Sequence, residues 1–261
     1  MSRLSTPAAM SRLSASRSGV LRFSTSTRPP LWLVVAALVT AAAASIPLVY
    51  LLVRAGESGL VSIIETLSRG RVLEYAANSL GLAAATTATA LVLGTAIAVV
   101  LTRVRVPFPR TWLLISALPL AVPSYLAGYG WLVAFPALNG FVPSWLLLTA
   151  VTVPYVTLPV AAALRGASGD LEGVARTLGR GPLRAFLVAT WPSVRPAAIA
   201  GSLLVALYAL SDFGLVAMMR FPTLTWGINA AYSASFDRAQ AATLALLLVV
   251  LALVVVAGER G

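Results

Sequence analysis

Residues Ala175–Pro192 read ARTLGRGPLRAFLVATWP and separate two long apolar stretches of the chain. Three arginines in this segment, Arg176, Arg180 and Arg184, recur at helical spacing. A Gly-Arg-Gly-Pro sequence interrupts the segment and a proline closes it. Two to eight residues are usually enough to join two helices of a bundle. This jointed, basic connection is longer, and it therefore indicates an element with a task of its own.

The composition around this segment is typical of a membrane protein. Of 261 residues, 59% are hydrophobic and 10% are charged, whereas soluble domains average about 45–50% apolar and about 25% charged residues. The absence of histidine and cysteine excludes Ser-His and Cys-His nucleophiles, zinc sites with the usual ligands and disulfides. The sequence has neither a P-loop nor a catalytic pair. We therefore expect no catalytic residue, no metal site and no enzymatic activity.

Six apolar segments approach the roughly 20 residues that a helix needs to cross a bilayer. They cover residues 31–53, 77–102, 112–135, 144–164, 196–218 and 239–258. If the N-terminus is inside the cell, fourteen of the 19 basic residues fall on the cytoplasmic side, which is the side that arginine favours. The sequence therefore predicts an all-α membrane protein with six transmembrane helices and both ends in the cytoplasm.

Three further segments flank or connect these spans. Residues 1–30 are rich in Ser and Arg and lack acids, which favours a disordered basic cytoplasmic tail over a transit peptide. The repeated MSRLS makes either Met1 or Met10 a candidate start. On the outer side, residues 54–76 carry an apolar pattern suited to an interfacial helix. Residues 219–238 form a second long outer connection.

Prolines recur inside the predicted spans, where each removes a backbone hydrogen bond and kinks or breaks its helix. Pro119 and Pro123 lie in the third span, and Pro154 and Pro159 lie in the fourth. Within a bilayer such breaks are tolerated where neighbouring helices or a water-filled cavity satisfy the freed groups. The prolines therefore favour a bundle that lines a cavity.

We expect the basic connection to fold as two short helices joined by a hinge. Asp170 is a suitable N-cap for the first helix, and Glu172 lies in its first turn, where the helix dipole favours an acid. Gly179 is suited to the left-handed conformation that ends such a helix. Pro182 suits the first position of the second helix, which should end before Pro192 bends the chain into the fifth span. A docking element for a cytoplasmic partner is favoured; the alternative is a basic loop that holds anionic headgroups.

Residues 172–179, EGVARTLG, followed by a proline thirteen residues after Gly179, resemble the EAA loop of ABC-importer permeases. In that family the loop forms a coupling helix that fits a groove in the ATPase subunit. Gly173 stands where the motif has Glu, Val174 where it has its first Ala, and Trp191 where Leu precedes the proline. The resemblance assigns the following residues to the ATPase contact: Glu172, Gly173, Ala175, Arg176, Leu178, Gly179, Arg180 and Pro192.

Other stretches resemble the same family. The start of its core permease domain is similar to residues 78–80 (NSL) and 93–98 (LGTAIA). Its ferric-iron branch is most similar to residues 118–125 (LPLAVPSY), 208–214 (YALSDFG) and 236–238 (FDR).

The resemblance also implies a domain division. The permease core would cover residues 74–258, with the coupling loop at 166–195. Residues 31–73 would hold the first transmembrane helix and the outer interfacial segment, and residues 1–30 the tail.

The resemblance implies a type I ABC-importer permease fold and import by alternating access. The chain would form half of the pathway for ferric iron or, alternatively, for thiamine, phosphonate or another small anion. Its partners would be two ABC ATPase subunits that bind ATP and Mg²⁺, a second permease half or subunit, an extracytoplasmic substrate-binding protein and the lipid bilayer of a bacterial inner membrane, but no nucleic acid. The chain itself would hold no cofactor. A secondary transporter or channel is the alternative class, although ion coupling favours several intramembrane ionisable residues.

Asp212 is the one acid inside a predicted span. Such a charge at a helix centre costs about 2.5–3.5 kcal/mol by insertion scales, so it should face protein or water. Three roles stay open: Asp212 caps a broken helix and packs against a neighbour, it lines the translocation path with Tyr208 and Ser211, or it lies near the membrane edge. Carboxylate and phenolate oxygens on a path would suit ferric iron, which prefers oxygen donors.

Overall fold

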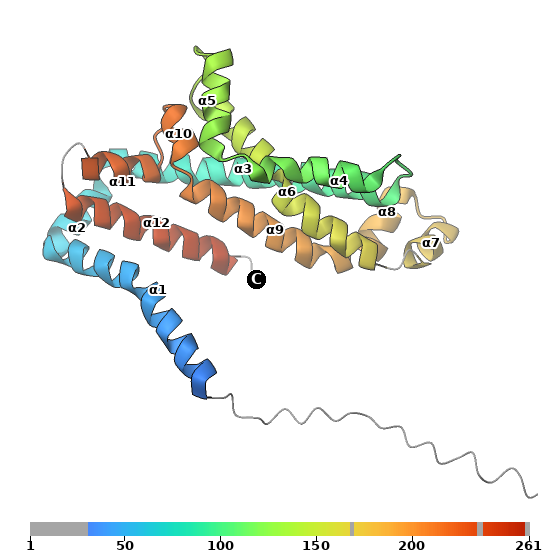
Figure 1. Ribbon diagram of the computed structural model, residues 1–261, viewed down its shortest axis with the longest axis horizontal. Helices are drawn as coiled ribbons and strands as arrows, with labels where there is room; N and C mark the ends of the chain where they lie inside the picture. Colours follow the sequence, from blue (N-terminus) through green and yellow to red (C-terminus); the bar gives the residue numbers. More distant parts are fainter. Residues whose placement is uncertain (1–30, 168–169, 234–236, 259–261) are drawn as a thin grey trace, which may run out of the picture. The chain divides into compact units, whose positions relative to one another are not determined.

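The computed structural model of the chain is helical in every element that it describes (Figure 1). It describes residues 31–167, 170–233 and 237–258. The tail expected at residues 1–30 lies outside the described residues, and so does the side chain of Asp170, the predicted N-cap of the loop.

The chain divides into two compact units, and the boundary falls inside the first helix. The first unit is Met1–Ile46 and the second is Pro47–Gly261. Helix α1 (Leu31–Glu57) contains this boundary. Every α1 residue of the first unit is exposed, although the helix is strongly apolar. A helix of this length and apolar composition is suited to lipid.

Five described helices are long and apolar enough to cross a membrane. They are α1, α3 (Gly70–Arg103), α6 (Phe141–Gly166), the continuous helical run Pro182–Ser211 and α12 (Arg238–Gly258). A bent helix pair between α3 and α6 supplies a sixth if the pair counts as one span. The prediction of an all-α membrane protein is thus confirmed. The orientation with both ends in the cytoplasm stays a prediction.

The third predicted span is a broken helix and not a straight one. Helix α4 (Pro109–Ala117) runs into a 3-10 turn that ends at Ala121. Helix α5 (Ser124–Ala134) is bent by 87° relative to this first segment, and Figure 1 shows the bend. Proline disfavours the helical conformation of the residue before it. Val122, which precedes Pro123, is accordingly extended, with φ −99° and ψ 114°.

The fifth predicted span, residues 196–218, is also divided. Helix α9 (Trp191–Ser211) stops before Asp212, and the short helix α10 (Gly214–Met218) follows the break. The two long connections predicted on the outer side each contain a helix, α2 (Gly59–Ser68) and α11 (Leu224–Ser233). The helix predicted within residues 54–76 is therefore present.

Helices α3, α6 and α9 pack together at the centre of the second unit. Their contact is made by small and branched side chains with little or no exposure, including Ala90, Ala98, Val156, Val160, Ala198 and Val205. A second apolar cluster joins α10 to α3, α6 and α9, and a third joins α11 and α12 to the start of α3. The three central helices thus form the frame that positions the loop at one end and the helix breaks at the other.

Proline does not interrupt α6, which runs through Pro154 and Pro159 as one helix. Pro159 has no N–H, so the carbonyl of Tyr155 four residues earlier lacks its helical partner. This carbonyl lies against Gly201 of α9, where a Cβ atom would stand only 2.6 Å from its oxygen. Glycine at 201 therefore makes room for a carbonyl that Pro159 has freed, and it allows the two backbones to approach closely.

Replacing Gly201 with alanine is expected to destabilise the folded chain by about 1–3 kcal/mol, because the methyl group would force α9 away from α6. The matched control is Gly81→Ala in α3, where an added Cβ meets no atom within 4 Å. Thermal unfolding of the purified protein in detergent measures both variants. If Gly201→Ala and Gly81→Ala unfold at the same temperature, then α9 can move away from α6 without a loss of stability.

Candidate functional site: the basic knob and the helix junction

The basic connection folds as a compact projection, which we call the basic knob (residues 170–190). It consists of α7 (Asp170–Thr177), a turn, α8 (Pro182–Ala185) and the π-helical turn η2 (Phe186–Thr190). The expected first helix and the hinge are present, and Pro182 starts the second arm, which is the beginning of a longer helical run and not a separate short helix. Ala175 and Ala185 are buried between the two arms.

Gly179 adopts the left-handed conformation that the sequence predicts, with φ +81°. The amide of Gly179 donates to the carbonyl of Arg176 at 3.0 Å, and the amide of Arg180 donates to the carbonyl of Ala175 at 3.2 Å. These two bonds form a Schellman motif, which satisfies the last carbonyls of α7. The turn direction between the arms of the knob therefore depends on a positive φ at residue 179.

Glu172 ties the two arms of the knob together. Its carboxylate forms an ion pair with Arg176 at 2.6 Å and accepts a hydrogen bond from the Thr190 hydroxyl at 3.0 Å. The Glu172 side chain is 13% exposed, and Thr190 is buried. Glu172 thus braces the knob internally. Sequence reasoning missed Thr190, although a threonine just ahead of a Trp-Pro pair was a visible polar residue in an apolar stretch.

The chain does not bend at Pro192, which corrects the sequence prediction. The helix continues from Pro182 to Ser211. The amide of Trp191 donates to the carbonyl of Phe186, a bond over five residues that widens this turn. Pro192 follows this widened turn directly as the second residue of α9, and the helical run is not interrupted there.

The outer surface of the knob combines apolar and basic side chains. Leu178 is 75% exposed and Leu183 70% exposed. The surface also carries exposed Gly173, Val174, Arg176, Arg180, Arg184, Leu187 and Val188. Exposed apolar side chains grouped on a rigid projection indicate a surface for a protein partner. At Gly173 an added Cβ would meet no atom within 4 Å, so the backbone leaves open space where a side chain would begin.

Asp212 lies at the break between α9 and α10 and is only 8% exposed. One carboxylate oxygen accepts the hydroxyl of Ser124, the first residue of α5, and the other accepts the amide of Leu215 at 3.0 Å. The backbone carbonyl of Asp212 accepts the Thr225 hydroxyl of α11 at 2.8 Å. We call this meeting of α5, α9, α10 and α11 the helix junction.

These contacts fit the capping and packing alternative among the three predicted for Asp212, and a place on the translocation path stays a prediction. Tyr208 and Ser211 do not join the junction through their side chains. The Tyr208 ring packs against Tyr155 with ring centres 5.9 Å apart, and the Ser211 hydroxyl bonds back to the Tyr208 carbonyl. Sequence reasoning missed Ser124, whose place directly after Pro123 was a recognisable helix start.

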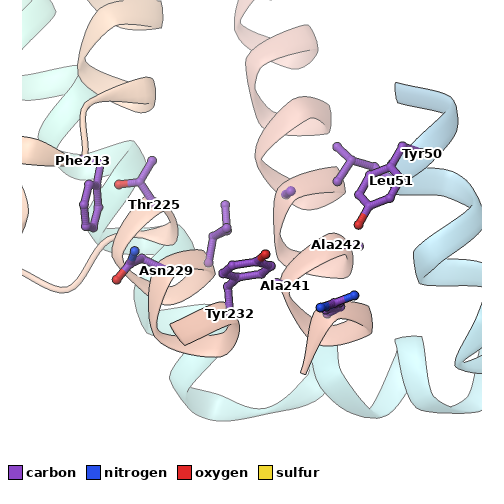
Figure 2. A pocket seen from close by; sticks show the side chains of 11 residues that line it. Tyr50, Leu51, Phe213, Thr225, Asn229, Tyr232, Ala241 and Ala242 are labelled. Carbon is purple, nitrogen blue, oxygen red and sulfur yellow. The ribbon is translucent and has the colours of Figure 1, made fainter. Parts of the chain in front are cut away.

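A pocket of about 430 Å³ lies beside the junction, within the second unit (Figure 2). Figure 2 shows Tyr50 and Leu51 of α1 on one side, Tyr232 of α11 in the middle, and Phe213 and Thr225 on the other side. The polar groups on its walls come from Tyr50, Thr225, Asn229, Tyr232 and Arg238, and none of the described residues that line it is an acid. These groups suit an anion or a neutral polar solute better than a cation.

Among the residues that the structure describes, no group of three or more His, Cys, Asp or Glu side chains comes together. A comparison with models of known protein families gives no match.

Several curated proteins are similar to this chain. It is 32% identical over 232 residues to the Fe(3+)-transport system permease protein FbpB 2 of Haemophilus influenzae, a match that covers 89% of this chain and 46% of that protein. It is 30% identical over 217 residues to PhnU of Salmonella choleraesuis, a permease named for 2-aminoethylphosphonate transport, covering 72% and 75% of the two chains. It is 29% identical over 250 residues to the Molybdenum transport system permease protein ModB of Mycobacterium tuberculosis, covering 88% and 93%. The chain spans about half the length of the iron permease, at 46%, and most of the length of the other two.

The fold is similar to a chain of the MetNI methionine ABC transporter in an inward-facing conformation. The TM-score is 0.58 at 18% sequence identity, and the match covers 76% of this chain and 95% of that one. This likeness concerns the arrangement of helices.

Proposed function

Since the chain belongs to the permease subunits of ABC transporters, we propose that it forms half of an importer's translocation pathway and that its basic knob docks onto an ATPase subunit. Two ATPase subunits would bind ATP and Mg²⁺, and a second permease half and an extracytoplasmic substrate-binding protein would complete the importer. This chain would hydrolyse nothing itself and would work by alternating access.

The observation that carries the docking proposal is the construction of the knob. It is rigid, because the Schellman motif fixes its turn and Glu172 links its arms. It also exposes Leu178 and Leu183 beside arginines that, apart from Arg176, have no acidic partner among the described residues. A rigid apolar surface rimmed by positive charge fits a groove with an apolar floor and acidic edges.

Replacing Leu183 with aspartate is expected to weaken ATPase binding at least tenfold, because a charge would enter an apolar contact. The control is Leu60→Asp, since Leu60 of α2 has similar exposure, 78% against 70%, but lies outside the knob. Pull-down of purified ABC ATPase subunits by the detergent-solubilised full chain measures both. If both variants bind as the unaltered chain does, the knob is not the docking surface.

Ferric iron is the substrate that we propose first, because the iron permease of Haemophilus influenzae is similar over 89% of this chain. The chain holds no described cluster of metal-binding side chains. Weak, scattered oxygen donors would be enough for a conduit that must release its ion, with high affinity residing in the binding protein.

A small oxyanion is the second candidate. The pocket in Figure 2 favours it, because Arg238, Tyr50, Tyr232 and Asn229 bring hydrogen-bond donors to its walls and none of the described lining residues is an acid. Uptake of labelled ferric iron, molybdate and 2-aminoethylphosphonate by cells that express the complete importer separates the two. Uptake of only an oxyanion, lost in Arg238→Gln, would replace the iron proposal.

A further inference from the structure

A second pocket, of about 430 Å³, lies between α4 and α6. Arginines stand at its rim: Arg110 is the second residue of α4, and Arg165 is the last but one of α6. The rest of the lining is apolar, with Leu113, Leu114 and Ala117 from α4 and Leu158 and Ala162 among those from α6. Charge is therefore confined to the end of the pocket where α4 begins and α6 ends.

Both rim arginines are exposed and lack an acidic partner. Among the described residues the ion pairs are Arg54–Glu57 and Arg176–Glu172, so neither Arg110 nor Arg165 is neutralised. Each guanidinium group keeps its planar set of donors free, and two such groups at one pocket mouth are suited to a phosphate oxygen.

We propose that this pocket binds an anionic phospholipid, with the phosphate between Arg110 and Arg165 and an acyl chain along the apolar wall. The pocket matches such a molecule in both of its parts, because a charged mouth at the end of two candidate spans opens onto a strip of Leu and Ala side chains. A soluble anion would make no contact with the apolar wall, and a neutral lipid would form no ion pair with the arginines. The inference does not depend on the transported substrate or on the ATPase contact.

The bound lipid would also have a place in the fold. It would hold the start of α4 against Arg165, which lies one residue before the end of α6. From there the chain leads toward the basic knob.

The test uses the full chain in detergent, titrated with phosphatidylglycerol and followed by native mass spectrometry. Each arginine near an anionic headgroup contributes about 1 kcal/mol, a factor of about five in affinity. Arg110→Gln together with Arg165→Gln should therefore weaken binding about 30-fold. Phosphatidylcholine, which carries no net charge, should bind the unaltered chain no better than it binds the double variant.

The matched control is Arg103→Gln with Arg105→Gln. These two arginines lie just before α4 but do not line the pocket. If the control pair weakens binding as much as the pocket pair, the attraction is a general surface effect and the proposal is overturned.

A second variant, Ala162→Phe, tests the apolar wall without changing charge. Ala162 is exposed, so the larger ring would fill the pocket without displacing the core. It should reduce phosphatidylglycerol binding about tenfold while leaving the melting temperature unchanged. Unaltered binding, or displacement of the lipid by millimolar inorganic phosphate alone, would overturn the proposal in favour of a simple oxyanion site.

Discussion

Gly179→Val is expected to abolish ATP-driven transport while leaving the chain folded and inserted in the membrane. Residue 179 has φ +81°, a conformation that costs an ordinary L-residue roughly 1–2 kcal/mol and a β-branched residue more. The turn would relax to a negative φ and lose the two hydrogen bonds of the Schellman motif. The angle between the two arms of the knob would then change, and the surface that they form together would no longer fit its groove.

The measurement is substrate uptake and ATPase stimulation by the assembled importer, with membrane insertion checked separately. Gly181→Val is the matched control, because Gly181 lies two residues away with φ −62° and ψ 159°, which valine adopts without strain. Gly179→Asn should recover part of the activity, since asparagine tolerates the left-handed region. Full transport by Gly179→Val would remove the knob from the coupling step.

Asp212→Ala is expected to destabilise the chain by about 2–4 kcal/mol, the second large effect. The substitution leaves the Ser124 hydroxyl and the Leu215 amide without their acceptor in a buried place, and each unsatisfied buried group costs about 1–3 kcal/mol. Asp212→Asn should cost less, because an amide oxygen still accepts from Leu215 and the amide nitrogen can donate to Ser124. Chemical unfolding in detergent measures both variants.

A double-mutant cycle with Ser124→Ala separates the capping role of Asp212 from a role in the translocation path. If Asp212 acts through the junction, the two substitutions together should cost clearly less than the sum of the single effects. Normal stability of Asp212→Ala combined with lost uptake would instead place the carboxylate on the path.

The local signals in the sequence were sufficient for the helices and for the turn of the knob. Apolar length predicted the crossing helices, and Gly179 followed by Gly181-Pro182 predicted the hinge, because these signals depend on neighbouring residues alone. The behaviour of the prolines was less predictable. Pro123 breaks its helix and Pro159 does not, since the outcome depends on whether a neighbour such as Gly201 accommodates the freed carbonyl.

The candidate site was predictable in its location but not in its internal bonds. The sequence singled out Glu172 and Asp212, and both carboxylates make contacts with other elements of the fold. Their partners, Thr190 and Ser124, lie 18 and 88 residues away along the chain. Such pairs arise from the packing of helices, and no local pattern reports them.

The unbroken helical run Pro182–Ser211 has a mechanical consequence. It is 30 residues long, about 45 Å at 1.5 Å per residue, and it joins the knob at one end to the Asp212 break at the other. Such a rod can act as a lever, with the knob (the handle) at its first end and the helix junction (the tip) at its last. A tilt of about 5° at the handle would displace the tip by about 4 Å. A small displacement of the knob would thus produce, at the opposite end of the rod, a shift the size of a side-chain contact.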